Sequence, residues 1–274
     1  MEVKAEAGEH SGFTHSSANL LKPYSDFLIY CNFPVALCTS SAAAGAYYFS
    51  GAPLNFSCLL FIFCATAFIY NLDHLNPSKS DRINSPERSK WITKNTSLLK
   101  SSICFYFVIC AIVLAFNPQS KIYLTAFSLL ALCNLYKGKL RKLPAMKNFT
   151  VAVVWTITVA ALPCIWLNAA PYTPFFGFCF LTALINTVIF DIRDLYGDQL
   201  EGVKSIPVLC GEKNSSKTIY ILCALTFIYS FTFLPPTLTA VPLLLAIIHK
   251  WENSKLKYLM ADLILAWPLV LTIF

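Results

Sequence analysis

The sequence predicts an all-α, polytopic membrane protein with about nine transmembrane helices in one bundle. Of its 274 residues, 57% are hydrophobic and only 13% are charged, whereas a soluble domain of this size also has to present a wettable exterior. The apolar residues form continuous runs that approach the roughly 20 residues of a helical crossing, and they do not alternate as in a membrane β-barrel. The third observation is that the basic residues gather on one side of these runs.

The expected elements follow in order along the chain. The first 22 residues are polar, contain three glutamates and lack the apolar core of a signal peptide, so we expect residues 1–22 to form a disordered tail. Residues 23–274 are expected to form a single transmembrane domain. Its expected spans are residues 26–48, 54–72, 98–116, 120–136, 149–168, 174–191, 217–234, 236–249 and 256–273.

The distribution of basic residues predicts the orientation of the chain. If the N-terminal tail is cytoplasmic, 20 of the 21 Lys and Arg residues fall in cytoplasmic segments and only Lys121 falls on the other side. Because basic residues are retained on the cytoplasmic side, this predicts a cytoplasmic N-terminus and cytoplasmic loops after every second span. The net charge of +7 is therefore a signal of topology and does not indicate a nucleic-acid partner.

The loop after the span 174–191 carries a cluster of acids. Asp191, Asp194 and Asp198 are spaced so that a helix would place them within about 60° of one another on one face. Gathering like charges is costly unless a cation lies between them, and carboxylate oxygens suit Mg²⁺. This loop therefore predicts a Mg²⁺ site, and its alternative is a solvated helix end where acids happen to cluster.

The loop after the span 54–72 mixes acids and bases. Asn71, Asp73 and Asp81 supply oxygen atoms, and Arg88 supplies positive charge. Pro77 should end any helix, so the later residues are expected on a loop or a short new helix. Carboxylates that hold a metal beside bases that bind phosphate would make an anion site, although charge-rich cytoplasmic loops are also common.

Both loops and a third, basic segment (136–147) are expected to face the same side, because four crossings separate the two acidic loops. Polar loops that roof a bundle of apolar helices indicate a site for an amphiphile with a charged head and an apolar tail. We therefore expect one bundle around a lipid-accessible cavity that is capped on the cytoplasmic side.

At this point the motifs resemble those of a known family, the UbiA superfamily of intramembrane prenyltransferases. The pattern DxRDxxGDxxxGxKSxPVxxG over residues 191–211 is similar to the second aspartate-rich motif of the family, and the segment that begins at Tyr136 resembles its Tyr-Ser-x-x-Leu-Lys stretch. The resemblance implies that Asp191, Asp194 and Asp198 hold Mg²⁺. It also implies that Lys204, with Lys139, binds the diphosphate.

The first motif departs from the family pattern, which usually reads Asn-Asp-x-x-Asp-x-x-x-Asp. Here Leu72 follows Asn71, and the acids are Asp73 and Asp81. By the resemblance, Asp73 and Asp81 would be the metal ligands of this motif, Asp73 would share the catalytic role with the second motif, and Asn71 and Arg88 would contact the diphosphate.

The function implied by the resemblance is a Mg²⁺-dependent transfer of a prenyl group from a prenyl diphosphate to an aromatic or other lipophilic acceptor. The resemblance implies no protein partner. Two alternatives remain open at this point. One is a terpene cyclase of the same fold, which the divergent first motif favours somewhat, and the other is a non-catalytic lipid-binding protein or transporter.

A few polar residues inside the spans are further candidates. An acid inside a span, such as Asp262, is a functional candidate by default, although its depth also suits the membrane interface. Asn32 and Asn186 are expected either to line the cavity or to form hydrogen bonds between helices. His74 adjoins Asp73, and we expect a surface histidine there rather than a base.

Overall fold

The computed structural model describes residues 26–251 and 254–268, and all regular structure in these ranges is helical. The predicted tail, residues 1–22, lies outside them. Residues 26–30 are helical. The elements that follow are α2 (Phe33–Ser50), α3 (Phe56–His74), α4 (Lys79–Asn84), α5 (Pro86–Lys94), α6 (Thr96–Ala115), α7 (Ser120–Gly138), η1 (Leu140–Lys142), α8 (Met146–Thr156), η2 (Ile157–Ala161), α9 (Leu162–Leu167), α10 (Thr173–Arg193), α11 (Leu195–Leu200), α12 (Ile206–Cys210), α13 (Glu212–Phe233), α14 (Pro236–His249) and α15 (Ser254–Leu265).

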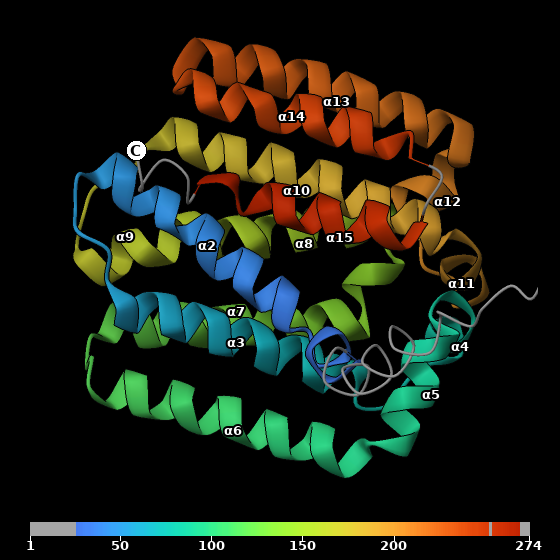
Figure 1. Ribbon diagram of the computed structural model, residues 1–274, viewed down its shortest axis with the longest axis horizontal. Helices are drawn as coiled ribbons and strands as arrows, with labels where there is room; N and C mark the ends of the chain where they lie inside the picture. Colours follow the sequence, from blue (N-terminus) through green and yellow to red (C-terminus); the bar gives the residue numbers. More distant parts are fainter. Residues whose placement is uncertain (1–25, 252–253, 269–274) are drawn as a thin grey trace, which may run out of the picture.

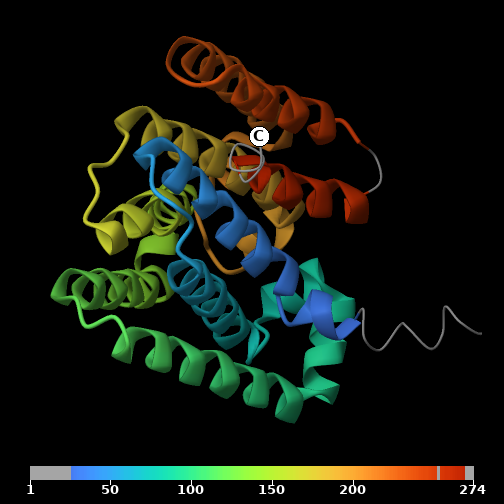
Figure 2. The same ribbon diagram turned by 60° about the vertical axis from the view of Figure 1, so that its left-hand side comes forward.

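The long helices run side by side, and the short helices α4, α5, α11 and α12 gather at one end of the bundle (Figure 1). We call this the loop end. Both views place α6 at one outer side of the bundle and the α13–α14 pair at the opposite side (Figures 1 and 2). Between them, α2 and α10 carry much of the buried core. The two acidic loops of the sequence therefore meet at the loop end.

Five segments of the described chain are long and apolar enough to cross a membrane. They are α3, α6, the run Met146–Leu167 from α8 to α9, α10 and α13. A further helix, α14, is apolar but has only 14 residues. The expectation of a bundle of apolar helices is met, but the predicted count of nine spans is not confirmed.

The first expected span, 26–48, is broken in the structure. Asn32 adopts a left-handed conformation with φ of 58°, and α2 begins only after it. Pro34 is tolerated at the start of a helix, where its missing N–H is not needed, but it interrupts a continuous one. The break turns the buried side chain of Asn32 toward α3, where its amide donates to Asn71 Oδ1 at 2.9 Å.

Small residues on α2 allow its neighbours to approach closely. Ala43 and Ala44 are fully buried, and a Cβ on Gly45 would lie only 2.6 Å from the Phe175 ring of α10. Without a hydrophobic driving force between helices in lipid, close backbone packing of this kind is a main source of helix association. The absence of a side chain at Gly45 therefore makes room beside α2 for the Phe175 ring of α10, the helix that carries the second acidic motif.

A close contact between α4 and α11 joins the two acidic loops. Gly197 on α11 faces Ser80 and Asn84 on α4, and a Cβ at Gly197 would overlap both side chains. The Asn84 amide donates to the carbonyl oxygen of Asp194 at 3.4 Å, and the backbone N–H of Ser80 donates to Glu201 at 3.2 Å. Only a glycine permits this approach.

Replacing Gly197 by alanine is expected to separate α4 from α11 and to lower the melting temperature of the purified protein. Overpacking costs about 1–3 kcal/mol, which exceeds the roughly 1 kcal/mol that alanine gains over glycine in a helix. Gly138→Ala is the matched control, because nothing lies within 4 Å of a Cβ at Gly138. The control should melt at or above the wild-type temperature, and equal shifts in the two variants would contradict the close contact.

Candidate active site

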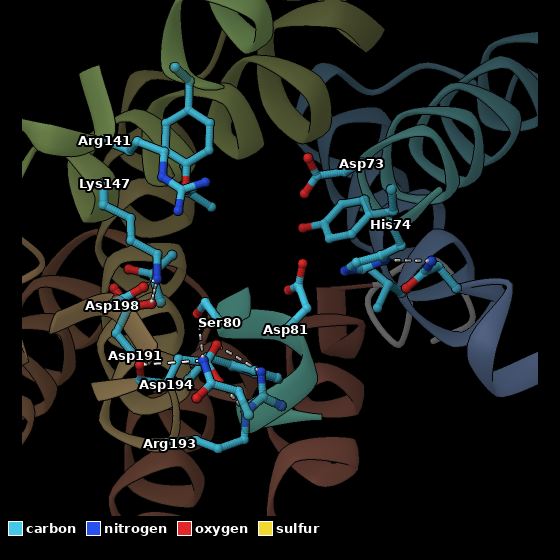
Figure 3. Close-up of a pocket in the computed structure, with 18 of the residues that line it drawn as sticks. Asp73, His74, Ser80, Asp81, Arg141, Lys147, Asp191, Arg193, Asp194 and Asp198 are labelled. Carbon is cyan, nitrogen blue, oxygen red and sulfur yellow. Dashed lines mark hydrogen bonds and ion pairs between the residues drawn. The ribbon is translucent and has the colours of Figure 1, made fainter. Parts of the chain in front are cut away.

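A cavity of about 560 Å³ lies at the loop end, and charged side chains dominate its lining (Figure 3). Seven carboxylates and five basic side chains line it, so its formal charge is −2. We call it the charged cavity. Its carboxylates are Asp73, Asp81, Asp191, Asp194, Asp198, Glu201 and Asp262, and its basic residues are Arg88, Lys137, Arg141, Lys147 and Arg193.

The centre of one wall is an ion triad in which Lys147 lies between two aspartates. The ammonium nitrogen of Lys147, on α8, is 2.7 Å from Asp191 Oδ1 and 2.7 Å from Asp198 Oδ2. Asp191 lies in the last turn of α10 and Asp198 lies on α11, and both side chains reach the same lysine. The sequence predicts one shared face for Asp191, Asp194 and Asp198. In the structure Asp191 and Asp198 share the ammonium of Lys147, whereas Asp194 does not contact it.

Asn148 fixes the position of Asp191. Its amide donates to Asp191 Oδ2 at 2.9 Å, and its Oδ1 accepts from the backbone N–H of Ile206 at 2.9 Å. Asn148 is fully buried. A buried amide with satisfied partners on both sides holds its neighbours in one geometry, so the first turn of α8 orients the Asp191 carboxylate and also anchors the start of α12.

Asp194 forms a separate ion pair with its neighbour Arg193. The guanidinium Nε lies 2.7 Å from Asp194 Oδ1 and a terminal nitrogen lies 3.0 Å from Oδ2, a bidentate geometry that is among the strongest pairs in proteins. The guanidinium carbon also lies 5.1 Å from the ring centre of Phe190 and 4.8 Å from that of Tyr258. These aromatic contacts hold Arg193 at the cavity wall.

Glu201 joins the walls of the charged cavity at the loop end. It forms an ion pair with Arg141, and it accepts the backbone N–H of Ser80. Burial alone would raise the pKa of Glu201, but the hydrogen bonds from Ser78 and Ser80 and the charge of Arg141 outweigh burial and lower its pKa below the ordinary value. Glu201 is therefore an ionised structural link between three segments.

The first acidic loop supplies the opposite wall (Figure 3). Asp73 is half exposed and lies 2.8 Å from the ammonium of Lys137. Asp81 begins α4 in a capping box, in which its Oδ2 accepts the Ser78 N–H at 2.8 Å and its own N–H donates to the Ser78 hydroxyl. As expected, the helix ends before Pro77, and Asp81 lies on a short new helix.

His74 connects this wall to the first helix. Its ring nitrogens lie 3.3 Å from Arg88 and 3.3 Å from the Asn32 amide, so it is a half-buried linking residue rather than a free surface histidine. Burial lowers the pKa of Arg88, and the nearby charge of Arg193 lowers it further. Even so, an arginine stays protonated at neutral pH, so Arg88 remains a cation on the lining of the charged cavity.

Three residues chosen from the sequence lie elsewhere among the described residues. Asn71 is fully buried behind the wall, between Asn32 and Ser102. Lys139 and Lys204 are exposed, and neither lines the charged cavity. The basic residues that line the charged cavity and were not chosen from the sequence are Lys137, Arg141, Lys147 and Arg193.

A second cavity, of about 360 Å³ and almost wholly apolar, adjoins the charged cavity. We call it the apolar cavity. It lies among α3, α6, α7 and α8, and its lining includes Phe61, Phe68, Phe107 and Leu129. The two cavities share a set of residues that we call the junction. The junction consists of Tyr70, Asp73, Tyr136, Lys137, Val151 and Trp155.

The lining of the charged cavity fits Mg²⁺ by its donor chemistry. Carboxylate oxygens are the ligands that Mg²⁺ prefers, and it commonly joins one or two of them to substrate phosphates while keeping several waters. No group of three or more metal-binding side chains in the described ranges is arranged to hold an ion by itself. The lining therefore suits an ion that also takes ligands from a bound phosphate. A formal charge of −2 also favours added cations before an anion can enter.

Apolar helices long enough to cross a membrane, with a charged cavity beside an apolar one, place the chain in the class of helical integral membrane proteins. The profile of the UbiA prenyltransferase family matches residues 31–263. The chain belongs to this family. The resemblance inferred from the second acidic motif is thus confirmed, and so is the all-α, polytopic fold class.

Two archaeal relatives are similar over part of the chain. The digeranylgeranylglyceryl phosphate synthase of Pyrococcus furiosus is 27% identical over 154 residues, which are 55% of this chain and 54% of that protein. The enzyme of the same name from Thermococcus sibiricus is 29% identical over 164 residues, which are 60% of this chain and 56% of that protein. The chain therefore matches about half the length of these relatives.

Solved structures share the fold over almost the whole chain. A UbiA homologue from Archaeoglobus fulgidus bound to DMAPP and Mg²⁺ has a TM-score of 0.62 at 15% identity, covering 90% of this chain and 98% of that chain. A UbiA homologue from Aeropyrum pernix without ligand has a TM-score of 0.62 at 15% identity, covering 88% and 98%. At such identities the likeness establishes the fold alone.

Proposed function

We propose that this protein is a Mg²⁺-dependent intramembrane prenyltransferase that moves a prenyl group from a prenyl diphosphate to an aromatic or other lipophilic acceptor. The observation that carries the proposal is the junction, where a cavity lined by charged groups adjoins one lined by apolar groups. A prenyl diphosphate has the same two-part character. Its diphosphate would lie in the charged cavity and its chain in the apolar cavity. Relatives named as synthases of a prenylated lipid phosphate support this proposal.

The basic residues of the charged cavity would bind the diphosphate. Arg88 lies on α5 and Arg141 on η1, and both line the charged cavity. Their guanidinium groups would therefore bind the anion from two different segments, with charge-assisted hydrogen bonds. Lys137 lies at the junction, where the diphosphate of the substrate would join its prenyl chain. When bound to the aspartates and to the diphosphate, Mg²⁺ would neutralise the charge that develops on the departing oxygens.

The aspartates of both loops would act at the diphosphate, as the motifs lead us to expect for Asp73, Asp191, Asp194 and Asp198, with Asp81 as a further metal ligand. Asp73, Asp81 and Asp194 would do so through Mg²⁺, and Asp191 and Asp198 through Lys147, which both contact. Lys139 and Lys204 are exposed in the structure, so their predicted contact with the diphosphate needs a movement of their loops. Arg141 and Lys147 line the charged cavity without any movement.

In the transfer step the bond between C1 of the prenyl chain and the diphosphate oxygen breaks, and its electron pair leaves with the diphosphate. A nucleophilic atom of the acceptor supplies the pair for the new bond to C1 and releases a proton. Tyr70, Tyr136 and Trp155 lie at the junction, where they exclude water from C1. Their ring faces also attract the cationic carbon, by about 0.5–2 kcal/mol each.

The acceptor would approach from the side of the charged cavity formed by α2, α10 and α15. Asp262 and Asn186 lie there, and the Asn186 amide donates to Asp262 Oδ1 at 3.3 Å. The carbonyl oxygen of Asn186 is buried and has no hydrogen-bond partner within the described chain. This pair offers hydrogen-bond acceptors to a hydroxyl group on the second substrate, and it lies on different helices from those around the apolar cavity.

The proposed orientation places the N-terminus and the loop end in the cytoplasm. The distribution of 20 of 21 basic residues on that side supports it. Residues 23–274 would then form a single domain that takes its diphosphate from the cytoplasmic face and its apolar groups from the bilayer.

The test is turnover of radiolabelled prenyl diphosphates of several chain lengths by the purified protein in detergent with Mg²⁺. A panel of aromatic and lipid-alcohol acceptors is added in one arm and omitted in the other. Prenylated acceptor that forms only with Mg²⁺ supports the transferase.

The Asp262→Asn variant should then raise the KM for the acceptor about tenfold or more, because a hydrogen bond to a charged group is lost. The KM for the prenyl diphosphate should stay unchanged.

Two other outcomes would contradict the proposal. A hydrocarbon or terpene alcohol formed without any acceptor would make the protein a cyclase, the reading favoured by Leu72 and the divergent spacing of the first motif. Absence of binding and of turnover at every chain length would favour a non-catalytic lipid-binding protein.

A further inference from the structure

The triad of Lys147 with Asp191 and Asp198 is the most buried group of charges in the charged cavity. The Lys147 side chain is 16% exposed, and those of Asp191 and Asp198 are 6% and 5% exposed. Two carboxylates brought together away from water need a cation between them. The ammonium of Lys147 lies within 2.7 Å of an oxygen of each, so it meets this need from within the chain.

Both carboxylate oxygens of Asp191 have a partner. Its Oδ1 contacts Lys147 and its Oδ2 accepts the Asn148 amide. Asn148 cannot turn away freely, because its own Oδ1 accepts the Ile206 N–H. Asp191 is therefore held in the orientation that faces the lysine, and the lysine is held by α8 at the start of its first turn.

We propose that Lys147 is a built-in cation that replaces one divalent ion at the second acidic motif, so that Mg²⁺ binds only beside Asp73, Asp81 and Asp194. This inference rests on the proposed use of Mg²⁺ and states which aspartates would bind the ion. Asp191 and Asp198 hold the lysine, and the other three aspartates bind the metal together with the substrate diphosphate.

A free ion cannot share this position with the lysine. Mg²⁺ between Asp191 and Asp198 would lie against a buried ammonium that has no other carboxylate at hydrogen-bond distance in the described chain, and like charges at this distance repel strongly. Mg²⁺ also gives up its water reluctantly, whereas the lysine is tethered at its place. The lysine therefore keeps the position, and its third N–H remains available to a diphosphate oxygen.

The experiment counts bound Mn²⁺, used as a paramagnetic probe for Mg²⁺, by electron paramagnetic resonance in the presence of inorganic diphosphate. Wild type is compared with Lys147→Met, which keeps the length of the side chain but removes its charge. Lys147→Met is expected to bind one more Mn²⁺ per chain than wild type. The matched control is Lys213→Met, which removes an exposed lysine of α13 that lines neither cavity and should leave the count unchanged.

A second variant keeps the inference testable if Lys147→Met does not fold. With Asp191→Asn and Asp198→Asn combined in the wild-type background, the Mn²⁺ count is expected to stay the same, because these residues hold the lysine. Loss of one ion in this double variant, or an unchanged count in folded Lys147→Met, would overturn the inference.

The count is independent of turnover, so the two proposals can fail separately. A protein that binds Mn²⁺ and diphosphate as described but converts no prenyl diphosphate would refute the proposed function and leave the role of Lys147 intact. A protein that turns over prenyl diphosphates but loses an ion in the aspartate double variant would keep the function and refute the role of Lys147.

Discussion

Asp194→Asn is expected to lower the turnover of prenyl diphosphates by about 10²–10³-fold, the usual cost of removing one group that stabilises charge in the transition state. Asp194 is the acid of the second motif that does not contact Lys147, and it faces the charged cavity from the end of α10. The asparagine keeps the shape and an acceptor for Arg193 but removes the negative charge that would attract a divalent ion.

The concentration dependence on Mg²⁺ checks the cause of this loss. The half-saturating Mg²⁺ concentration should rise in Asp194→Asn, whereas Glu212→Gln, which changes an exposed acid in the first turn of α13, should match wild type in both turnover and Mg²⁺ dependence. If turnover is lost but the Mg²⁺ dependence is unchanged, Asp194 positions Arg193 and does not bind the metal.

Ala65→Phe is expected to shift the preference of the protein toward shorter prenyl chains, with a loss of about 10²-fold in kcat/KM for the longest chain that wild type accepts. Ala65 lies on α3 and lines the apolar cavity. A prenyl chain that moves from lipid into an apolar cavity gains little free energy from the transfer. The effect of the substitution therefore comes from the lost volume of the cavity. A prenyl chain that cannot enter fully would displace its diphosphate, and a displacement of about 1 Å lowers the rate about 10²-fold.

Ala111→Phe is the matched control for this substitution. Ala111 is exposed on α6 and lines neither cavity of the described chain, so the same change in volume there should leave the order of preference among chain lengths as in wild type. A loss of activity with all chain lengths in Ala65→Phe would indicate a packing defect and would place the prenyl chain elsewhere.

Much of this architecture can be predicted from the sequence because the bilayer imposes simple rules. Continuous apolar runs predict helices, and the spacing of Asp191 and Asp198 predicts their shared face. The first helix is harder to predict, since its interruption depends on a left-handed Asn32 whose side chain finds Asn71 on another helix. A contact between residues 39 positions apart leaves no local trace in the sequence.

The site residues divide in the same way. Asp73, Asp81, Arg88 and the acids of the second motif belong to recognisable motifs, and all of them line the charged cavity. Lys147 lies in a basic segment that looks like an ordinary topological signal, and its partners lie 44 and 51 positions further along the chain. Charge and motif predict Lys139 and Lys204 as diphosphate ligands, but neither property reveals the direction in which a side chain points.

The contact between α4 and α11 has a consequence for the biosynthesis of the protein. The hydrogen bond from Ser80 to Glu201 spans 121 residues, so the charged cavity closes only after α10 and α11 have left the ribosome and α10 has entered the membrane. Chains fold progressively from the N-terminus during synthesis, and a nascent chain shorter than this carries an open acidic loop without its counterpart. A product that ends before Asp191 therefore keeps the wall formed by the first acidic loop but lacks the ion triad. The proposed reaction with prenyl diphosphates would then require that more than two thirds of the chain has been made.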